Sequence, residues 1–188
     1  MNLGEAIHAR RAVRAYKPDA VDESIVRRLL GEAIQAPSAM NAQPWVFSIV
    51  QDRARLRRYS DRAKRLMLEL SATEPKVRVY ADMLRNEAFN VFYDAGTLIV
   101  IGVRERTAFS EADGWLAAQN LMLTACEAGL GTCCIGFALS VLNLPDVKQE
   151  LSIPAEGAAI APIIVGYPSS SVPPVARQEP HIGSWLRG

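Results

Sequence analysis

Cysteine and histidine are scarce in this sequence. Three cysteines and two histidines occur among its 188 residues, and two of the cysteines, Cys133 and Cys134, are adjacent. An odd number of cysteines with this spacing excludes a disulfide framework and suits a reducing compartment. The chain has no Cys-x-x-Cys pair, and only His8 and His181 could supply imidazole ligands. We therefore expect no structural zinc site and no other metal.

An excess of one charge and a long apolar run are also missing. The 21 basic and 20 acidic residues leave a formal net charge of +1, so no overall field attracts nucleic acid or a membrane surface. No run approaches the ~18 apolar residues of a membrane span, and no apolar signal core follows Met1. We expect a cytoplasmic protein without nucleic-acid or membrane partners.

The apolar content of the chain is sufficient for one hydrophobic core. Hydrophobic residues make up 49% of the sequence, and no repeat or low-complexity linker divides it. Residues 1–188 are therefore predicted to form a single domain. The Pro- and Ser-rich stretch from about 169 to 188 is predicted to be an extended tail.

Hydrophobic periodicity predicts a mixture of helices and strands. Helical spacing covers residues 3–11, 23–35, 52–71, 111–128 and 144–151, and apolar strands cover residues 45–50, 97–103 and 158–165. Asp22 is the expected N-cap of the second helix, and Ser110 with Asp113 resembles a capping box. Pro162 interrupts the last strand, which predicts an edge or a bulge there.

Residues 52–65 carry the strongest local charge imbalance. This stretch contains two acidic residues, Asp52 and Asp61, and seven basic ones: Arg53, Arg55, Arg57, Arg58, Arg62, Lys64 and Arg65. A solvated helix face is the simpler interpretation, because the aromatic residues that accompany base recognition are few here. A rim that attracts phosphorylated ligands is the alternative. Residues 72–94 are predicted to be helical with a break at Pro75, without an assigned role.

The loop at residues 36–45 is unusually rich in hydrogen-bonding side chains. Ser38, Asn41 and Gln43 lie between two prolines and just before Trp45. Composition alone is equally consistent with a surface turn.

Two further segments could contact a ligand. Residues 10–14 begin at the end of a helix, where cations suit the helix dipole, and continue as an extended segment. There Arg10 and Arg14 fall on one side and could converge on one anion. Gly136 follows an apolar segment and would let a flat ligand approach the backbone closely.

Four segments of this chain, in register, resemble the FMN-dependent nitroreductase family. Residues 10–14 resemble its opening Arg-Arg-Ser-Val-Arg, and residues 36–45 resemble its Ala-Pro-Ser-x-x-Asn-x-Gln-Pro-Trp loop. Residues 129–136 are similar to its Gly-Leu-Gly-Thr-Cys-Trp-Ile-Gly segment, and residues 166–168 with Arg177 resemble its closing Gly-Tyr-Pro and C-terminal Arg. The resemblance covers nearly the whole chain.

This resemblance implies an α+β fold and an oligomer. The expected architecture is a nitroreductase-like sandwich, a mainly antiparallel sheet flanked by helices, in an intertwined homodimer with two FMN molecules at the interface. The helix at 111–128, apolar almost all round, would then be the dimer core.

The resemblance also implies a cofactor site without a catalytic side chain. Arg10 and Arg177 would hold the FMN phosphate, and Arg14 would lie at the N1–O2 edge of the ring. The loop would line the flavin bound by the partner subunit. The expected cofactor-binding residues are Arg10, Arg11, Ala12, Arg14, Pro37, Ser38, Ala39, Asn41, Ile135, Gly136 and Arg177.

Three positions depart from the family pattern. Ala12 replaces a Ser, Cys134 stands where Trp is common, and Val175 stands where a Lys often precedes the last Arg. These departures affect FMN affinity and substrate shape rather than the presence of the site.

The activity implied is that of an NAD(P)H-dependent FMN oxidoreductase. It would take electrons from NADH or NADPH and reduce nitroaromatic or quinone-type small-molecule acceptors by a ping-pong mechanism. Two alternatives stay open. One is a flavin enzyme of the same fold with a dedicated substrate, such as flavin destruction or dehalogenation, and the other is a non-enzymatic FMN-binding module.

Overall fold

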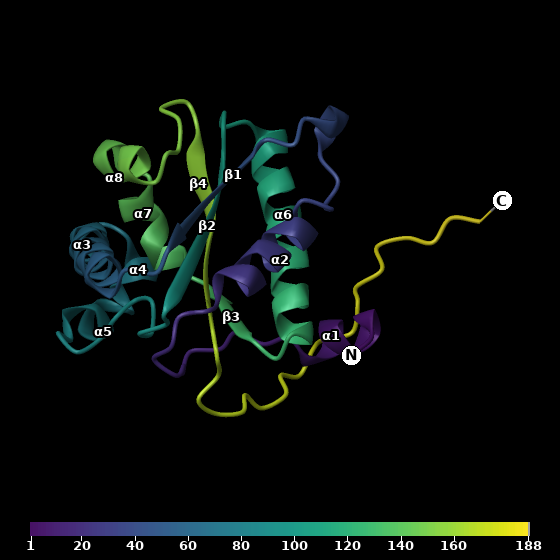
Figure 1. The fold of residues 1–188 in the computed structure, drawn as a ribbon, viewed down its shortest axis with the longest axis horizontal. Helices are drawn as coiled ribbons and strands as arrows, with labels where there is room; N and C mark the ends of the chain where they lie inside the picture. Colours follow the sequence, from purple (N-terminus) through teal and green to yellow (C-terminus); the bar gives the residue numbers. More distant parts are fainter. Residues whose placement is uncertain (188) are drawn as a thin grey trace.

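A four-stranded antiparallel sheet lies at the centre of the computed structural model, which describes residues 1–187 (Figure 1). The strands are β1 (Trp45–Val50), β2 (Thr97–Val103), β3 (Gly131–Cys134) and β4 (Ala158–Gly166), arranged in the order β1-β2-β4-β3. Every residue of β2 and β4 is buried. Their continuous apolar sequences follow from this, because neither face of either strand meets water.

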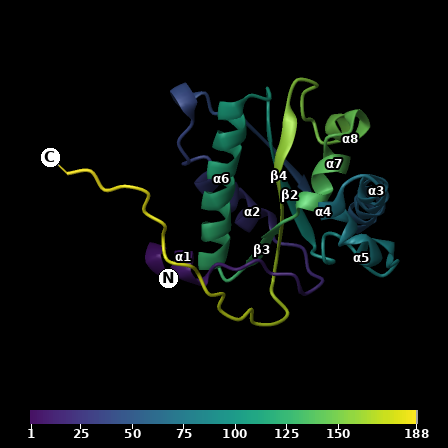
Figure 2. The same ribbon diagram turned by 180° about the vertical axis from the view of Figure 1, so that it is seen from behind.

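Helices cover both faces of the sheet (Figures 1 and 2). One face carries α2 (Glu23–Ala33) and α6 (Ala108–Glu127), and the other carries α3 (Arg53–Ser71), α7 (Leu139–Leu142) and α8 (Pro145–Glu150). Side chains of β2 alternate between the two cores, with Ile99 and Ile101 on the α6 side and Leu98 and Val100 on the α3 side. The predicted α+β architecture, an antiparallel sheet flanked by helices, is confirmed.

Shorter helices complete the chain. They are α1 (Leu3–Ala9), η1 (Ala39–Asn41), α4 (Pro75–Arg78), α5 (Ala81–Arg85) and η2 (Gly136–Ala138). The break predicted at Pro75 is present, since this proline opens α4 after α3 has ended. No helix within residues 1–187 combines the length and apolar character that crossing a bilayer requires.

The start of α6 differs from the predicted capping box. Thr107 is the N-cap: its side chain accepts the Ser110 N–H, and Ser110 Oγ accepts the Thr107 N–H. The proposed pairing of Ser110 with Asp113 is therefore wrong, and the helix begins three residues earlier than predicted, at Ala108 rather than residue 111. Asp22 does occupy the N-cap position of α2, although its side chain makes no capping hydrogen bond.

Pro162 lies in an interior strand, so the edge alternative of its prediction is wrong. An irregularity does lie two residues away, because the β2–β4 register shifts between Ala161 and Ala159 and leaves Ile160 without a paired residue in β2. Pro162 pairs with Val100 of β2, and β3 runs along the other side of β4. The Ile135 N–H donates to the Pro162 carbonyl over 2.8 Å. Because the N and O of one strand residue point to the same side, the nitrogen without a proton also faces β3. The proline therefore ends the β3–β4 ladder, and β3 stops at Cys134.

The basic side chains of α3 are largely paired within the chain. Arg55 and Arg58 contact Glu150 at 3.1 and 2.7 Å, and Arg62 contacts Asp146 at 2.6 Å. The Arg62 hydrogen bond lowers the pKa of the Asp146 carboxyl below its ordinary value. These contacts favour the structural interpretation of the basic helix over a rim for phosphorylated ligands.

Gly131 is the residue that allows the N-terminal segment to reach the sheet. An added Cβ at this position would lie 2.7 Å from the Val13 side chain, closer than real contacts allow. Beside it, the Val13 N–H donates to the Thr132 carbonyl over 2.9 Å, and Ala12 forms a parallel bridge with Thr132. The extended segment after α1 thus lies against β3 only because no side chain stands between them.

We expect Gly131→Ala to lower the free energy of unfolding by about 1–3 kcal/mol, because the added methyl group must displace Val13 or the segment. Gly31→Ala is the matched control: nothing lies within 4 Å of its Cβ position in α2, so it should gain about 0.5–1 kcal/mol. Urea denaturation measures both. If Gly131→Ala is as stable as the wild type, Val13 can move aside without loss of stability, and the close contact is not required.

Candidate functional site

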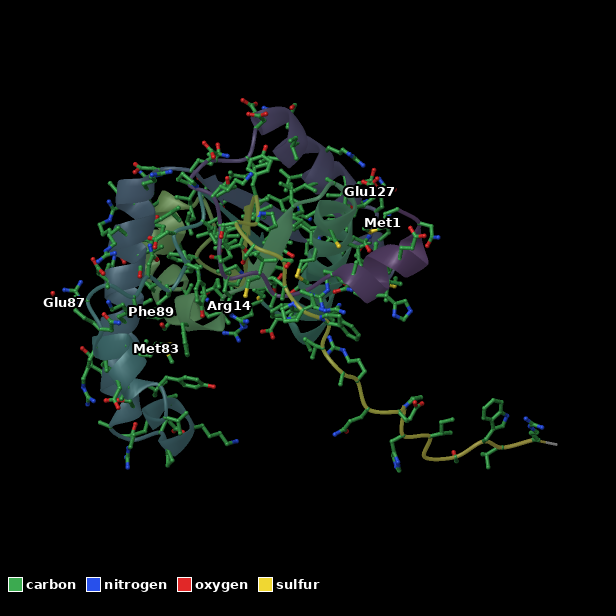
Figure 3. All side chains as sticks on the ribbon, turned by 90° about the horizontal axis from the view of Figure 1, so that it is seen from below. Met1, Arg14, Met83, Glu87, Phe89 and Glu127 are labelled. Carbon is green, nitrogen blue, oxygen red and sulfur yellow. The ribbon has the colours of Figure 1, made fainter. Side chains whose placement is uncertain are left out.

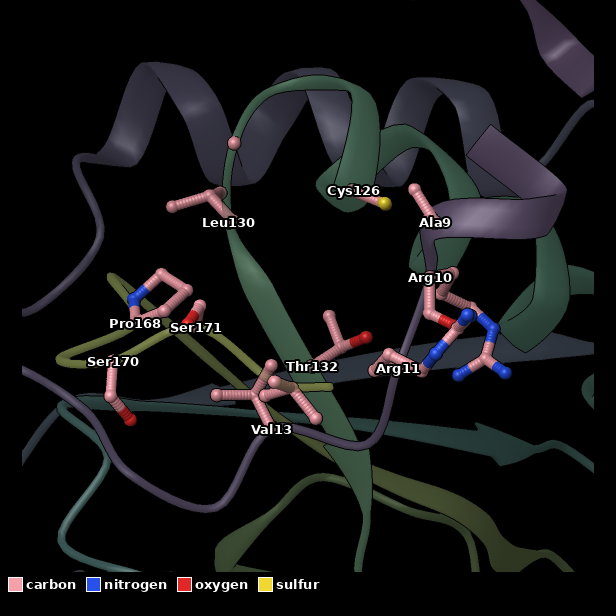
Figure 4. A pocket seen from close by; sticks show the side chains of 12 residues that line it. Ala9, Arg10, Arg11, Val13, Cys126, Leu130, Thr132, Pro168, Ser170 and Ser171 are labelled. Atoms are coloured by element: carbon pink, nitrogen blue, oxygen red, sulfur yellow. The ribbon is translucent and has the colours of Figure 1, made fainter. Parts of the chain in front are cut away.

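The extended segment that follows α1 and lies beside β3 forms one wall of a cavity of about 210 Å³. Figure 4 shows Arg10 and Arg11 on one side of it and Ser170 and Ser171 on the other. The chain leaves α1 at Arg10 with φ −55° and ψ 128°, so the helix stops and the backbone becomes extended. The cavity therefore gathers cations where the segment meets β3.

The two arginines of this cavity have different roles. The Arg11 guanidinium turns back and donates to the carbonyls of His8 and Arg10, over 2.6 and 2.8 Å. It thereby satisfies carbonyls left open at the end of α1. The side chain of Arg11 thus serves the helix, and Arg10 is the one available to a ligand.

A second cavity, of about 300 Å³, lies further along the same segment. It is lined by Arg14, Val91, Tyr93, Cys133, Cys134, Ile135, Gly136 and Phe137. A Cβ added to Gly136 would meet nothing within 4 Å, so its backbone faces open space. The structure thus brings together the predicted residues Arg14, Ile135 and Gly136.

Cys133 lines the second cavity together with Arg14. Burial raises the pKa of its thiol above the ordinary value, while the charges of Arg14 and Arg10 partly oppose this rise. Arg10 and Arg14 nevertheless line different cavities, so their convergence on a single anion stays a prediction. Burial also raises the pKa of Cys134 to about 11. Burial thus favours the protonated form of both thiols, which argues against a nucleophilic cysteine.

The loop at residues 36–45 is ordered by hydrogen bonds to its own backbone. Ser38 Oγ accepts the Gln43 N–H over 3.0 Å. Met40, Asn41 and Gln43 have φ values of 52°, 53° and 46°, an uncommon left-handed conformation for residues other than glycine. Met40 is fully exposed at the tip. The polar residues of this loop therefore build a fixed protrusion.

Asp113 anchors this protrusion, a role the sequence did not indicate. Its carboxylate accepts the Ala39 N–H over 3.1 Å, and its carbonyl accepts the Trp45 indole N–H over 3.1 Å. Asp113 is 5% exposed. The partners are 74 and 68 residues apart in sequence, so no local pattern could have paired them.

Within one chain, the loop and the arginine cavities lie at opposite ends of α6. Asp113, which holds the loop, is in the first turns of α6, and Cys126, which lines the Arg10 cavity, is in the last. About 13 helical residues at 1.5 Å each separate them by about 20 Å. Figure 1 shows the loop and α1 at opposite ends of α6. The loop residues Pro37, Ser38, Ala39 and Asn41 therefore do not reach the arginine cavities of their own chain.

Arg177 lies in the extended tail that follows β4. After β4 the chain bends past Ala15, whose carbonyl accepts the Ser169 N–H, and then runs away from the body of the protein (Figure 2). Arg177 is exposed there, and its guanidinium donates to the Ala176 carbonyl over 3.4 Å. The pairing of Arg177 with Arg10 stays a prediction.

The model of the nitroreductase family matches residues 7–167. The chain belongs to the nitroreductase family. The matched region contains the whole lining of the second cavity, the arginine side of the first cavity and the loop, and it ends just before Pro168, Ser170 and Ser171 on the other side of the first cavity. The family resemblance inferred from the four sequence segments is thereby confirmed.

Individual relatives of this family member carry different names. The chain is 35% identical over 175 residues to a 5,6-dimethylbenzimidazole synthase from Rhodospirillum rubrum, covering 87% of this chain and 81% of the relative. It is 26% identical over 175 residues to a putative NADH dehydrogenase/NAD(P)H nitroreductase from Methanothermobacter thermautotrophicus, with 91% and 80% covered. Family membership alone therefore does not define the reaction.

Among solved structures, the fold matches a nitroreductase with bound FMN from Bacteroides fragilis. The TM-score is 0.82 at 22% identity, over 99% of this chain and 98% of the other. At that identity the match establishes the shared fold.

Replacing Asp113 by Ala should loosen the loop, because the Ala39 N–H loses its acceptor. We expect the free energy of unfolding to fall by about 1–3 kcal/mol, with faster amide hydrogen exchange at residues 39–43. Asp82→Ala is the control, since Asp82 is fully exposed and pairs with the exposed Arg85; its effect should stay within about 0.5 kcal/mol. Unchanged exchange in Asp113→Ala would contradict the anchoring role.

Proposed function

We propose that this protein is an FMN-dependent oxidoreductase that uses NADH or NADPH to reduce nitroaromatic or quinone-type acceptors, as a homodimer. One observation carries this proposal: two cavities follow one another along β3, with Arg10 at the first and Arg14 beside the open backbone of Gly136 at the second. A flat ring with a phosphate-bearing chain fits this arrangement, because phosphate favours guanidinium partners and a ring needs close approach to the backbone.

The backbone of the segment adds to this fit. The Val13 N–H points to β3, so the N–H of the preceding residue, Ala12, points away from the sheet. Ala12 has no hydroxyl to offer a phosphate, yet its N–H stays available. FMN would thus be held by Arg10 and the Ala12 N–H at its phosphate end, and by Arg14, Ile135 and Gly136 at its ring.

FMN, when bound, supplies the acceptance and donation of hydride. The residues of the chain then have to position the ring, exclude water and set the local charge. Tyr93 and Phe137 form aromatic walls of the second cavity, and Arg14 places a positive charge there. We assign no side chain to proton transfer or nucleophilic attack.

Within one copy of the chain, the loop lies about 20 Å from the arginine cavities. In a homodimer, the loop of the second copy would complete these cavities. The exposed apolar side chains of α6 support such an interface, since Phe109 is 72% exposed and Trp115 and Leu116 are each 45% exposed. Exposed apolar residues that gather on one element are typical of protein–protein contacts. Pro37, Ser38, Ala39 and Asn41 would then line the ring from the partner.

A second candidate is a flavin enzyme with a dedicated substrate. The 35% identity to a 5,6-dimethylbenzimidazole synthase supports it, and so does Cys134, which replaces the bulkier Trp common in the family at the wall of the second cavity. This candidate uses the same cofactor site and differs in the acceptor.

Anaerobic titration with NADH and NADPH tests the main proposal. The purified protein should be yellow, should sediment as a dimer, should lose its flavin absorbance on reduction, and should regain it with a nitroaromatic or quinone. Bound FMN that neither nucleotide reduces would instead support a binding module. Loss of the flavin chromophore in air would support flavin destruction, and a monomer that retains FMN would contradict the shared site.

Arg10→Ala and Arg177→Ala should each weaken FMN binding. Loss of one charge-assisted contact costs about 1.5–3 kcal/mol, or roughly ten- to hundredfold in affinity. Arg27→Ala is the control, because Arg27 is exposed on α2 and paired with Glu23. Unchanged dissociation constants for both Arg10 and Arg177 variants would remove them from the phosphate site.

Arg14→Gln should act on the reduced cofactor more than on its binding. A positive charge near the ring favours the more negative, reduced state. Its loss should lower the midpoint potential of bound FMN by tens of millivolts, at about 30 mV per 1.4 kcal/mol for two electrons. Redox titration against a reference dye measures this. An unchanged potential combined with weaker binding would place Arg14 at the phosphate instead.

A further inference from the structure

The turn that follows α5 contains two adjacent residues in a conformation that favours glycine. Tyr93 and Asp94 have φ values of 52° and 54°, and neither is glycine. A bulky aromatic residue rarely adopts this region of backbone space. Such conformations persist only where the surroundings enforce them, and they concentrate at functional sites.

Asn90 enforces this conformation from inside the protein. It is 7% exposed, its Oδ1 accepts the Phe92 N–H over 2.9 Å, and its Nδ2 donates to Asp94 Oδ1 over 2.8 Å. The Tyr93 N–H in turn donates to the Asn90 carbonyl over 2.9 Å. One buried amide thus closes the turn on both sides of Tyr93 and fixes the direction of its side chain.

The turn presents the Tyr93 ring to Arg14. The Arg14 guanidinium carbon lies 5.9 Å from the ring centroid, within the range of a cation–π contact. Phe89 supports the ring with an edge-on contact, with centroids 5.7 Å apart and planes at 80°. Figure 3 shows Arg14 and Phe89 on the same underside of the molecule. Tyr93 therefore lies between a fixed aromatic support and the guanidinium.

Arg14 has no carboxylate that could orient it. It is exposed, and none of the ion pairs found in the described part of the chain, residues 1–187, includes it. Its guanidinium also interacts with the Cys133 thiol, a weak hydrogen-bond partner that opposes the rise in the thiol pKa, and a long, exposed side chain held by one weak contact still samples many rotamers. The Tyr93 ring is the second contact that holds Arg14 at the mouth of the second cavity, whose lining includes Arg14, Tyr93 and Cys133.

We infer that Tyr93 is a positioning residue that holds the Arg14 guanidinium over the cavity formed by Ile135 and Gly136. This inference rests on the proposed function, because it concerns the ring end of the same cofactor site. Without the Tyr93 ring, the guanidinium turns toward solvent and its charge is screened there. Residues 90–94 thereby gain a role that their sequence did not indicate.

A double-mutant cycle on the FMN-bound protein tests this inference. Tyr93→Leu should lower the ratio of affinities for reduced and oxidised FMN three- to tenfold, which is about 14–30 mV in midpoint potential. Tyr93→Phe, which keeps the ring, should retain the wild-type potential. In an Arg14→Gln background, Tyr93→Leu should have no further effect, because the two residues act as one unit.

Tyr80→Leu is the matched control. Tyr80 contacts Phe137, with ring centroids 5.2 Å apart, so this variant removes an aromatic ring near the same cavity without a contact to Arg14. Its potential should equal that of the wild type. A wild-type potential in Tyr93→Leu, or an equal shift with and without Arg14, would overturn the inference.

A second measurement needs no FMN. In NMR spectra of the flavin-free protein, ring currents from Tyr93 should displace the side-chain proton signals of Arg14 from their random-coil positions, and Tyr93→Leu should abolish this displacement. Random-coil signals in the wild type would overturn the inference directly. If the protein fails to bind FMN, the proposed function is wrong, and this spectrum still decides whether Tyr93 holds Arg14.

Discussion

The contact between residues 12–13 and β3 is the interaction on which the candidate site depends. It rests on the hydrogen bond from the Val13 N–H to the Thr132 carbonyl and on the missing side chain of Gly131. The same pairing places Arg10 at one cavity and Arg14 at the next. Without this pairing, the segment that carries Arg10 and Arg14 would not be held against β3, and neither cavity would have a charged wall.

Much of this fold can be predicted from residues that are close in sequence. The strands β2 and β4 are recognisable because continuous burial on both faces requires continuous apolar sequence. Part of the lining of the two cavities could also be predicted from the sequence, since extended geometry puts Arg10 and Arg14 on one side and Gly136 marks an open backbone. These inferences share one property: each depends on residues that are close in sequence.

The features that sequence did not predict depend on distant partners. Asp113 was assigned to a local cap, but its carboxylate accepts an N–H from a residue 74 positions away. Pro162 suits an interior strand only because β3 happens to end opposite it. The positive φ of Tyr93 follows from the buried Asn90 amide. In each case the deciding contact forms only after the chain has folded, so it cannot be predicted from local sequence propensity.

The separation of the loop from the arginine cavities along α6 has a thermodynamic consequence. In the proposed homodimer, each cofactor site is completed by a second copy, so cofactor binding and association are linked equilibria. Dilution should then release cofactor, and added cofactor should tighten the dimer, although no residue at the interface has changed. The cell could thus set the fraction of loaded enzyme through the abundance of the polypeptide itself.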